Sequence, residues 1–146
     1  MHTRKFEIYL WMVLGGLISG CAPAQQGGPR IETTPVTGIV EVDGEPAENL
    51  LVECHPQPGT ETIKYPLTAL TDAEGRFSMS MYQAGDGLPE GTYNLAFVWE
   101  EMGIPPKDRL KGAYADPKKS KHQLTVVSGE SNDIGLIELS TKGAKP

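Results

Sequence analysis

The chain has 146 residues with 19 acidic and 13 basic side chains, and its formal net charge is −6. This length suffices for one domain. An acidic chain lacks the electrostatic footprint of proteins that bind nucleic acid or anionic lipid head groups, so neither is an expected partner.

The first 20 residues have the pattern of an export signal. Arg4 and Lys5 precede an apolar run of about eleven residues from Ile8 to Ile18, which is shorter than the roughly 20 residues that span a bilayer. The following letters ISGC resemble the lipobox of bacterial lipoproteins. The resemblance implies that Cys21 receives a diacylglycerol thioether, is acylated, and becomes the first residue of the mature chain.

Lipidation of Cys21 would also determine where the protein lies. We expect the cell envelope, with the outer membrane favoured, because residue 22 is Ala and not the Asp that favours inner-membrane retention in enterobacterial-type lipoproteins. Residues 21–35 are rich in Pro, Gly and Gln, which predicts a flexible tether. Cleavage removes two basic and one acidic side chain and leaves 11 basic and 18 acidic ones, a charge of −7. Contact with the bilayer is therefore expected through the lipid alone.

Residues 36–141 predict about seven short strands separated by glycine-containing turns. The first strand ends at the turn Asp43-Gly44, residues 49–56 form the second, and residues 66–81 form two strands around a turn at residues 72–75. Residues 91–100, 122–132 and 133–140 contain the remaining strands. The apolar side chains that we expect to face the core are Leu50, Val52, Cys54, Phe77, Met79, Met81, Tyr93, Leu95, Phe97, Trp99, Ile134, Leu136 and Leu139.

This rhythm predicts an all-β fold, a single immunoglobulin-like or transthyretin-like β-sandwich. No segment keeps helical periodicity long enough for a core helix. Residues 100–121 interrupt the strand pattern with a long charged segment, in which residues 107–112 could form a short turn of helix. Residues 142–146 are expected to be a disordered tail.

Three segments resemble carboxypeptidase regulatory-like domains, which are transthyretin-like β-sandwiches. They are VTGIVEVDGEP, TDAEGRFSMS and GDGLPEGTYNLAF, and they occur in the order seen in that family. The residues that match the family pattern are Asp43, Gly44, Pro46, Thr71, Asp72, Gly75, Phe77, Gly91 and Tyr93. Because these residues shape turns and core, the resemblance implies a fold and an accessory, stabilising or binding role, not a reaction.

No arrangement of nucleophile and base stands out, so we expect no enzymatic activity, no cofactor and no metal. After processing, only His55 and His122 remain as histidines, and no Gly-x-Ser-x-Gly elbow is present. The alternative is a metal-dependent carbohydrate-binding or carbohydrate-processing envelope protein, if the histidines meet a carboxylate or the acidic turns hold calcium. Cys54, left without a cysteine partner, is expected to be a buried thiol.

Basic residues gather between positions 107 and 121 of this acidic chain. The residues that we expect to contact a partner are Lys107, Arg109, Lys111, Tyr114, Lys118 and Lys119, with Lys121 beside them. Long-range attraction to an acidic envelope protein or an anionic polysaccharide would speed their encounter and weaken with salt. The sequence therefore predicts a lipid-anchored, non-catalytic binding or structural module whose partner is not specified.

Overall fold

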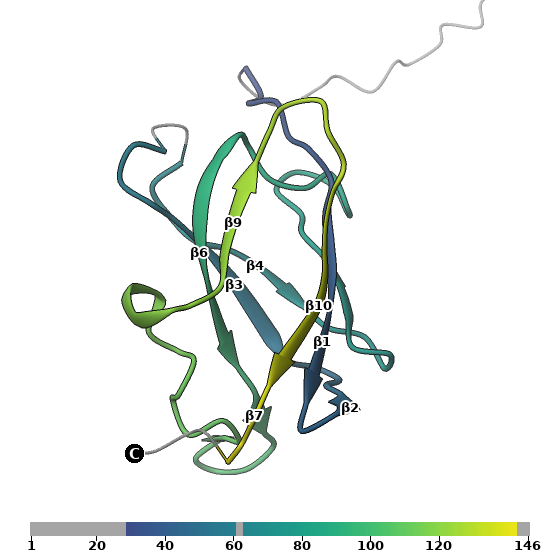
Figure 1. Cartoon of the computed structure of the whole chain (residues 1–146), viewed down its shortest axis with the longest axis vertical. Helices are drawn as coiled ribbons and strands as arrows, with labels where there is room; N and C mark the ends of the chain where they lie inside the picture. The colour runs from purple at the N-terminus through teal and green to yellow at the C-terminus, as the bar shows by residue number, and fades with distance from the viewer. Residues whose placement is uncertain (1–28, 61–62, 143–146) are drawn as a thin grey trace, which may run out of the picture. The chain divides into compact units, whose positions relative to one another are not determined.

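The computed structural model describes residues 29–60 and 63–142, and its strands lie within one compact unit, Ile31–Pro146 (Figure 1). The predicted signal peptide, Cys21 and most of the predicted tether lie outside the described residues. Residues 143–146 of the predicted tail also lie outside them. Thr34 and Pro35, at the end of the predicted tether, belong to the compact unit, where Thr34 forms a β-bridge with Leu88.

The fold is all-β, as predicted. In chain order the strands are β1 (Val36–Val42), β2 (Glu45–Pro46), β3 (Leu51–Pro56), β4 (Leu67–Leu70), β5 (Arg76–Ser78), β6 (Gly91–Val98), β7 (Glu100–Glu101), β8 (Lys107–Asp108), β9 (Gln123–Val126) and β10 (Asn132–Leu139). Among the strands of residues 29–60 and 63–142, only β2, β7 and β8 are two residues long, which leaves seven longer strands, in agreement with the predicted number. Within the described part of the chain, no helix is long and apolar enough to cross a membrane.

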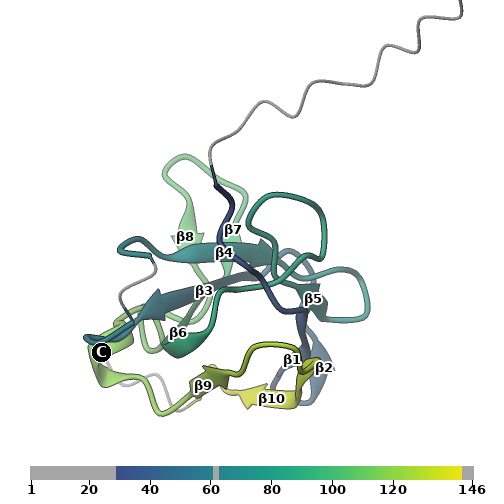
Figure 2. The same cartoon turned by 90° about the horizontal axis from the view of Figure 1, so that it is seen from above.

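Two four-stranded sheets form the layers (Figure 2). In sheet 1, β10 pairs in parallel with β1, while β2 and β5 pair antiparallel with β1. Sheet 2 is antiparallel, with the order β4-β3-β6-β9. A separate small hairpin joins β7 to β8. The first and last long strands are therefore neighbours in one sheet.

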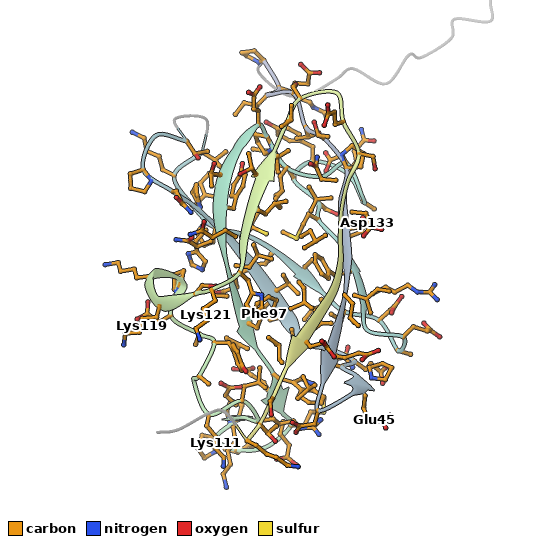
Figure 3. All side chains as sticks on the ribbon, in the orientation of Figure 1. Glu45, Phe97, Lys111, Lys119, Lys121 and Asp133 are labelled. Carbon is orange, nitrogen blue, oxygen red and sulfur yellow. The ribbon has the colours of Figure 1, made fainter. Side chains whose placement is uncertain are left out.

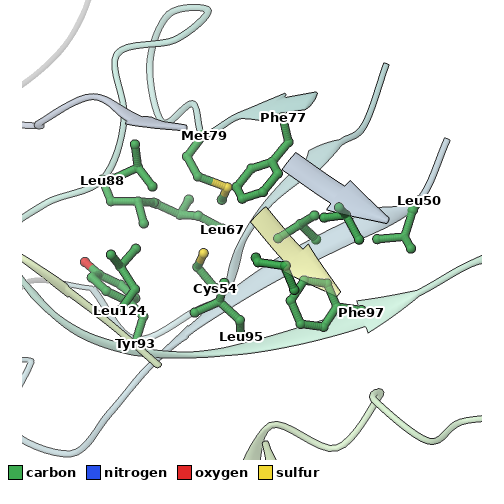
Figure 4. Packing of buried hydrophobic residues seen from close by; sticks show 14 of the residues in the cluster. Leu50, Cys54, Leu67, Phe77, Met79, Leu88, Tyr93, Leu95, Phe97 and Leu124 are labelled. Atoms are coloured by element: carbon green, nitrogen blue, oxygen red, sulfur yellow. The ribbon is translucent and has the colours of Figure 1, made fainter. Parts of the chain in front are cut away.

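The core lies between the two sheets and follows the predicted alternation of buried and exposed residues (Figure 4). In β3, Val52 and Cys54 are fully buried, and in β6 the aromatic side chains of Tyr93 and Phe97 are fully buried. The Tyr93 hydroxyl donates a 2.8 Å hydrogen bond to the Pro89 carbonyl oxygen, which satisfies its one polar atom. These strands were predictable because their large apolar side chains alternate, although Ala96 on the opposite face of β6 is also buried.

The prediction for β10 is wrong at Leu136, which is 52% exposed. Thr37 aligns with Asp133 and Ile39 with Leu136, so β10 contains one extra residue in this interval. Gly135 lies in the interval with φ +75°, a conformation that suits a β-bulge. The bulge reverses the alternation, so Ile137 is buried instead of Leu136, whereas the prediction that Leu139 faces the core is confirmed.

The predicted turn at residues 72–75 joins the two sheets. One Asp72 carboxylate oxygen accepts hydrogen bonds from the backbone N–H groups of Glu74 at 3.0 Å and Arg76 at 2.8 Å. The strand before the turn, β4, pairs in sheet 2, whereas the strand after it, β5, pairs in sheet 1. The turn therefore carries the chain across the core.

Thr71, just before this turn, has a buried hydroxyl that bonds to the backbone of the segment between β2 and β3. The hydroxyl accepts a 2.8 Å hydrogen bond from the Leu50 N–H and donates to the Ala47 carbonyl oxygen. Thr71→Val should reduce the free energy of unfolding by about 1–3 kcal/mol, because both backbone groups lose their partner. Thr71→Ser keeps the hydroxyl and should cost about 1 kcal/mol for the lost methyl group. Urea denaturation of the three proteins checks this, and a valine variant no weaker than the serine variant would contradict it.

Candidate functional site

The segment between β6 and β9 is an ordered structure with three parts. It consists of the β7–β8 hairpin, a turn that buries Leu110 completely, and a short 3-10 helix, Pro117–Lys119. The suggested helical turn at residues 107–112 is wrong, because these residues form β8 and the turn after it. Leu110 anchors the segment in the core and was not singled out from the sequence.

The carboxylate of Asp108 organises this turn. One oxygen accepts hydrogen bonds from the N–H groups of Trp99 at 3.1 Å and Leu110 at 2.9 Å, and the other accepts from Gly112 at 2.6 Å. The Arg109 N–H also donates to the Trp99 carbonyl oxygen at 2.7 Å. Sequence reasoning missed Asp108. The available signal was an aspartate followed four residues later by Gly112, because both residue types are common in turns.

Asp108→Ala should loosen this segment without unfolding the sandwich. We expect the free energy of unfolding to fall by about 2–3 kcal/mol, because hydrogen bonds to a charged acceptor are the stronger kind. Amide exchange should quicken at Trp99, Leu110 and Gly112. The matched control is Asp116→Ala, which removes one backbone hydrogen bond at the 3-10 helix and should cost about 1 kcal/mol. Equal exchange at these three amides in both variants would contradict the role of Asp108.

Two of the predicted partner-binding residues pack against the protein's own side chains. The Arg109 Cζ lies 3.5 Å from the centroid of the Trp99 ring, a cation–π arrangement. The Trp99 Nε1 donates a 2.9 Å hydrogen bond to the Glu48 carbonyl oxygen. Tyr114 is half-buried, and its hydroxyl accepts a 3.1 Å hydrogen bond from the Ser140 N–H. These contacts fix the segment, and Arg109 stays exposed together with the lysines.

We call residues 107–121 the basic loop. With six basic and two acidic side chains, this loop has a charge of +4, and the rest of the mature chain, with five basic and 16 acidic side chains, has −11. All of its lysines are exposed: Lys107, Lys111, Lys118, Lys119 and Lys121. Figure 3 shows Lys111, Lys119 and Lys121 on one side of the unit and Glu45 and Asp133 on the other.

Little of this positive charge is neutralised within the described part of the chain. There, only Lys119 among the five lysines forms an ion pair, 3.5 Å from an Asp116 carboxylate oxygen. The Lys119 side chain is 85% exposed in this pair, and such pairs contribute about 0–1 kcal/mol. The lysines are therefore free to meet an external acidic group.

The two histidines have separate surroundings. The His55 Nε2 lies 3.0 Å from a Glu53 carboxylate oxygen, and the His122 ring meets the Phe97 ring edge-on at 5.4 Å between centroids. Burial, and then the charge of Lys121, lower the pKa of His122. In residues 29–60 and 63–142 no three His, Cys, Asp or Glu side chains are grouped to hold a metal ion.

The carboxylates of Asp43 and Asp86, in two of the acidic turns, accept hydrogen bonds from nearby groups of the protein. Asp43 accepts hydrogen bonds from the hydroxyls of Thr141 at 2.5 Å and Ser140 at 2.7 Å, and these bonds lower its pKa. Burial raises the pKa of Asp86, but the N–H groups of residues 81–83 at 2.7–3.0 Å outweigh it and lower the pKa overall. Both carboxylates stabilise turns.

Cys54 is fully buried, and burial raises the pKa of its thiol from 9.0 to about 12. Above pH 9 the unfolded chain therefore loses a proton that the folded chain keeps, so stability is complete below pH 9 and falls as the pH rises. Between pH 9 and 10 we expect the free energy of unfolding to fall by about 1 kcal/mol from this group. Cys54→Ala should remove this decrease. Urea titrations at both pH values check it, and an unchanged decrease in the variant would contradict it.

A pocket of 390 Å³ opens on the outer face of sheet 1, away from the basic loop's residues. It is lined by residues of β1 and β5 and residues around them, and its charged members are Asp72, Arg76 and Asp133. Phe77 covers Gly38, at which a Cβ would lie 2.8 Å from the ring. The sequence did not indicate this pocket, because its residues are far apart along the chain.

Comparisons with known proteins assign no family. No known family model matches the chain, and no curated protein matches it. A 9R-lipoxygenase from Cyanothece PCC8801 is similar in structure with a TM-score of 0.41 and 15% identity, over 74% of this chain and 16% of the lipoxygenase. DUF3823 family proteins from Bacteroides ovatus ATCC 8483 and Parabacteroides merdae ATCC 43184 give TM-scores of 0.37 and 0.36, each at 16% identity. These matches cover 73% and 76% of this chain but 44% and 46% of those proteins, so the chain spans less than half of each.

Proposed function

We propose that this chain is a bacterial envelope lipoprotein, anchored in the outer membrane through acylated Cys21, and that its β-sandwich is a non-catalytic binding module. In this proposal the sandwich is a carboxypeptidase regulatory-like domain. Its basic loop binds an acidic envelope protein or an anionic polysaccharide.

The observation that carries the binding role is the way the basic loop is built. Asp108, Leu110 and the stacked pair Trp99–Arg109 hold the loop in place, so its lysines project from a fixed backbone. Lysines that are already positioned lose less conformational entropy when they bind. The acidic remainder of the chain orients an acidic partner toward this loop.

Substitution of the loop lysines tests this function. Membranes containing the full-length protein are cross-linked, and partners are recovered with the wild type and with Lys111→Ala, Lys118→Ala and Lys119→Ala combined. We expect recovery to fall at least about tenfold, and recovery by the wild type to fall in high salt.

The matched control replaces three basic residues outside the basic loop and outside the pocket on sheet 1: Lys64, Lys142 and Lys145. This control removes the same number of positive charges. It should leave recovery within about twofold of the wild type, because salt screens exposed charges that do not contact the partner. Equal loss in both triple variants, or no loss in either, would contradict a specific role of the basic loop.

A further inference from the structure

The tip of the β7–β8 hairpin exposes apolar side chains without cover. Met102 is 100% exposed and Ile104 is 105% exposed, the two largest exposures among the large hydrophobic side chains that the structure describes. Exposed apolar groups that lie together mark interaction sites. Lys107 and Lys111 follow on the same hairpin and turn, both exposed. This tip, residues 102–106, thus combines an apolar projection with nearby positive charge.

The outer face of sheet 1 has the opposite character. Ile39 and Leu136 are cross-strand neighbours on β1 and β10, and they are 36% and 52% exposed. Ile39 also lines the 390 Å³ pocket. The face thus presents an apolar centre with a hollow next to it.

Carboxylates border this apolar centre. Glu41 and Glu138 face each other in register on β1 and β10, and like charges placed directly opposite destabilise a sheet. Neither glutamate forms an ion pair with any residue in the described ranges. At the pocket, Asp72 and Asp133 outnumber the single cation, Arg76. A positively charged partner would relieve this repulsion.

We propose that the hairpin tip of one copy docks into the pocket on sheet 1 of a second copy of this chain. Met102 and Ile104 match the exposed apolar pair Ile39 and Leu136 at the edge of the pocket, and Lys107 and Lys111 match Glu41 and Glu138. This inference rests on the proposed function, because it names the acidic partner of the basic loop.

The geometry gives this contact a direction. In Figure 1 the hairpin with β7 lies at one end of the unit, and in Figure 3 Asp133 lies on its flank, so tip and pocket occupy separate parts of the surface. A contact between two different patches is heterologous: each copy keeps one free tip and one free pocket. Docking therefore builds a row of copies and not a closed dimer.

Photo-cross-linking from the tip tests the contact in membranes that contain the full-length chain. A benzophenone amino acid replaces Ile104, and two differently tagged versions of the chain are expressed together. We expect cross-links between the two versions that map to β1, β5 or β10. The same probe at Leu70, which is exposed on β4 of sheet 2, is the matched control and should give at least about tenfold less of this product.

Charge exchange then tests the pairing. Lys107→Glu with Lys111→Glu should lower the cross-link yield at least about tenfold, as should Glu41→Lys with Glu138→Lys. All four substitutions in one chain should restore the yield to within about twofold of the wild type, which a loss of folding could not produce.

The outcomes separate the two proposals. Cross-links from position 104 to other proteins only, with partner recovery still dependent on the loop lysines, would overturn this inference and leave the proposed function standing. Cross-links between copies that ignore all the charge changes would overturn the inference as well, because the contact would not use the acidic face. Absence of any cross-link from position 104 would also overturn it.

Discussion

Replacing Cys21 with alanine is expected to abolish lipid attachment completely. The thiol is the only group in the ISGC segment that can accept a diacylglycerol, so radiolabelled palmitate should mark the wild type and leave Cys21→Ala unlabelled. Two or more acyl chains hold a protein on a bilayer at roughly 0.8 kcal/mol per buried CH2 group. The apolar run before Cys21 is too short to replace them as a membrane span. The variant should therefore lose its stable membrane attachment and keep residues 1–20, the predicted signal peptide.

The chain contains its own control, since it has one other cysteine. Cys54 is fully buried in the core, and Cys54→Ala should be labelled as strongly as the wild type. Gel mobility distinguishes processed from unprocessed chains. Labelled Cys21→Ala, or a Cys21→Ala chain that stays in the membrane fraction after alkaline extraction, would contradict lipidation at this residue.

Strands with one buried face could be predicted from the sequence. Alternation in β3 and β6 identified Val52, Cys54, Tyr93 and Phe97 as core residues, and all four are buried. Apolar periodicity works there because every second side chain must leave water. The all-β class followed from the same rule.

Long-range pairing could not be predicted in this way. Nothing local in β1 and β10 shows that the two strands lie side by side in parallel. The bulge at Gly135 adds one residue to β10 and exposes Leu136, whereas an unbroken alternation would bury it. The segment on both sides of residues 72–75 likewise looks like one hairpin, although its strands belong to different sheets.

The basic loop shows the same division between local and long-range information. Its charge can be read from composition, but the residues that the fold itself uses cannot. Arg109 stacks on Trp99 of the preceding strand segment, and Tyr114 is bonded to Ser140 beyond β10. Such contacts cannot be read from composition. The structure shows that Arg109 and Tyr114 also hold the loop, whereas its lysines take no part in these contacts.

Gly87→Ala is expected to cause the largest loss of stability of any single methyl addition considered in this protein. A Cβ at residue 87 would overlap the carbonyl group of Thr34 and lie 2.7 Å from the Cα of Pro35. These are backbone atoms, which cannot rotate away as a side chain does. Gly87 also has φ +90°, which costs an L-residue roughly 1–2 kcal/mol.

The clash would separate two segments that hold each other. The Thr34 N–H donates to the Leu88 carbonyl oxygen at 2.8 Å, and the Leu88 N–H donates to the Thr34 carbonyl oxygen at 3.0 Å. Leu88 is fully buried, so moving this bridge also disturbs the core. Strain, two hydrogen bonds and lost packing together predict a decrease of about 4 kcal/mol or more in the free energy of unfolding.

Gly112→Ala separates the steric effect from the backbone effect. Gly112 has φ +74°, but a Cβ there would have no atom within 4 Å. This variant should lose only about 1–2 kcal/mol, the cost of the positive φ alone. Urea denaturation of both variants and the wild type gives the difference. Equal losses would contradict this prediction. They would mean that the Thr34–Leu88 bridge can shift at no cost in stability, and that β1 and not this bridge fixes the start of the sandwich.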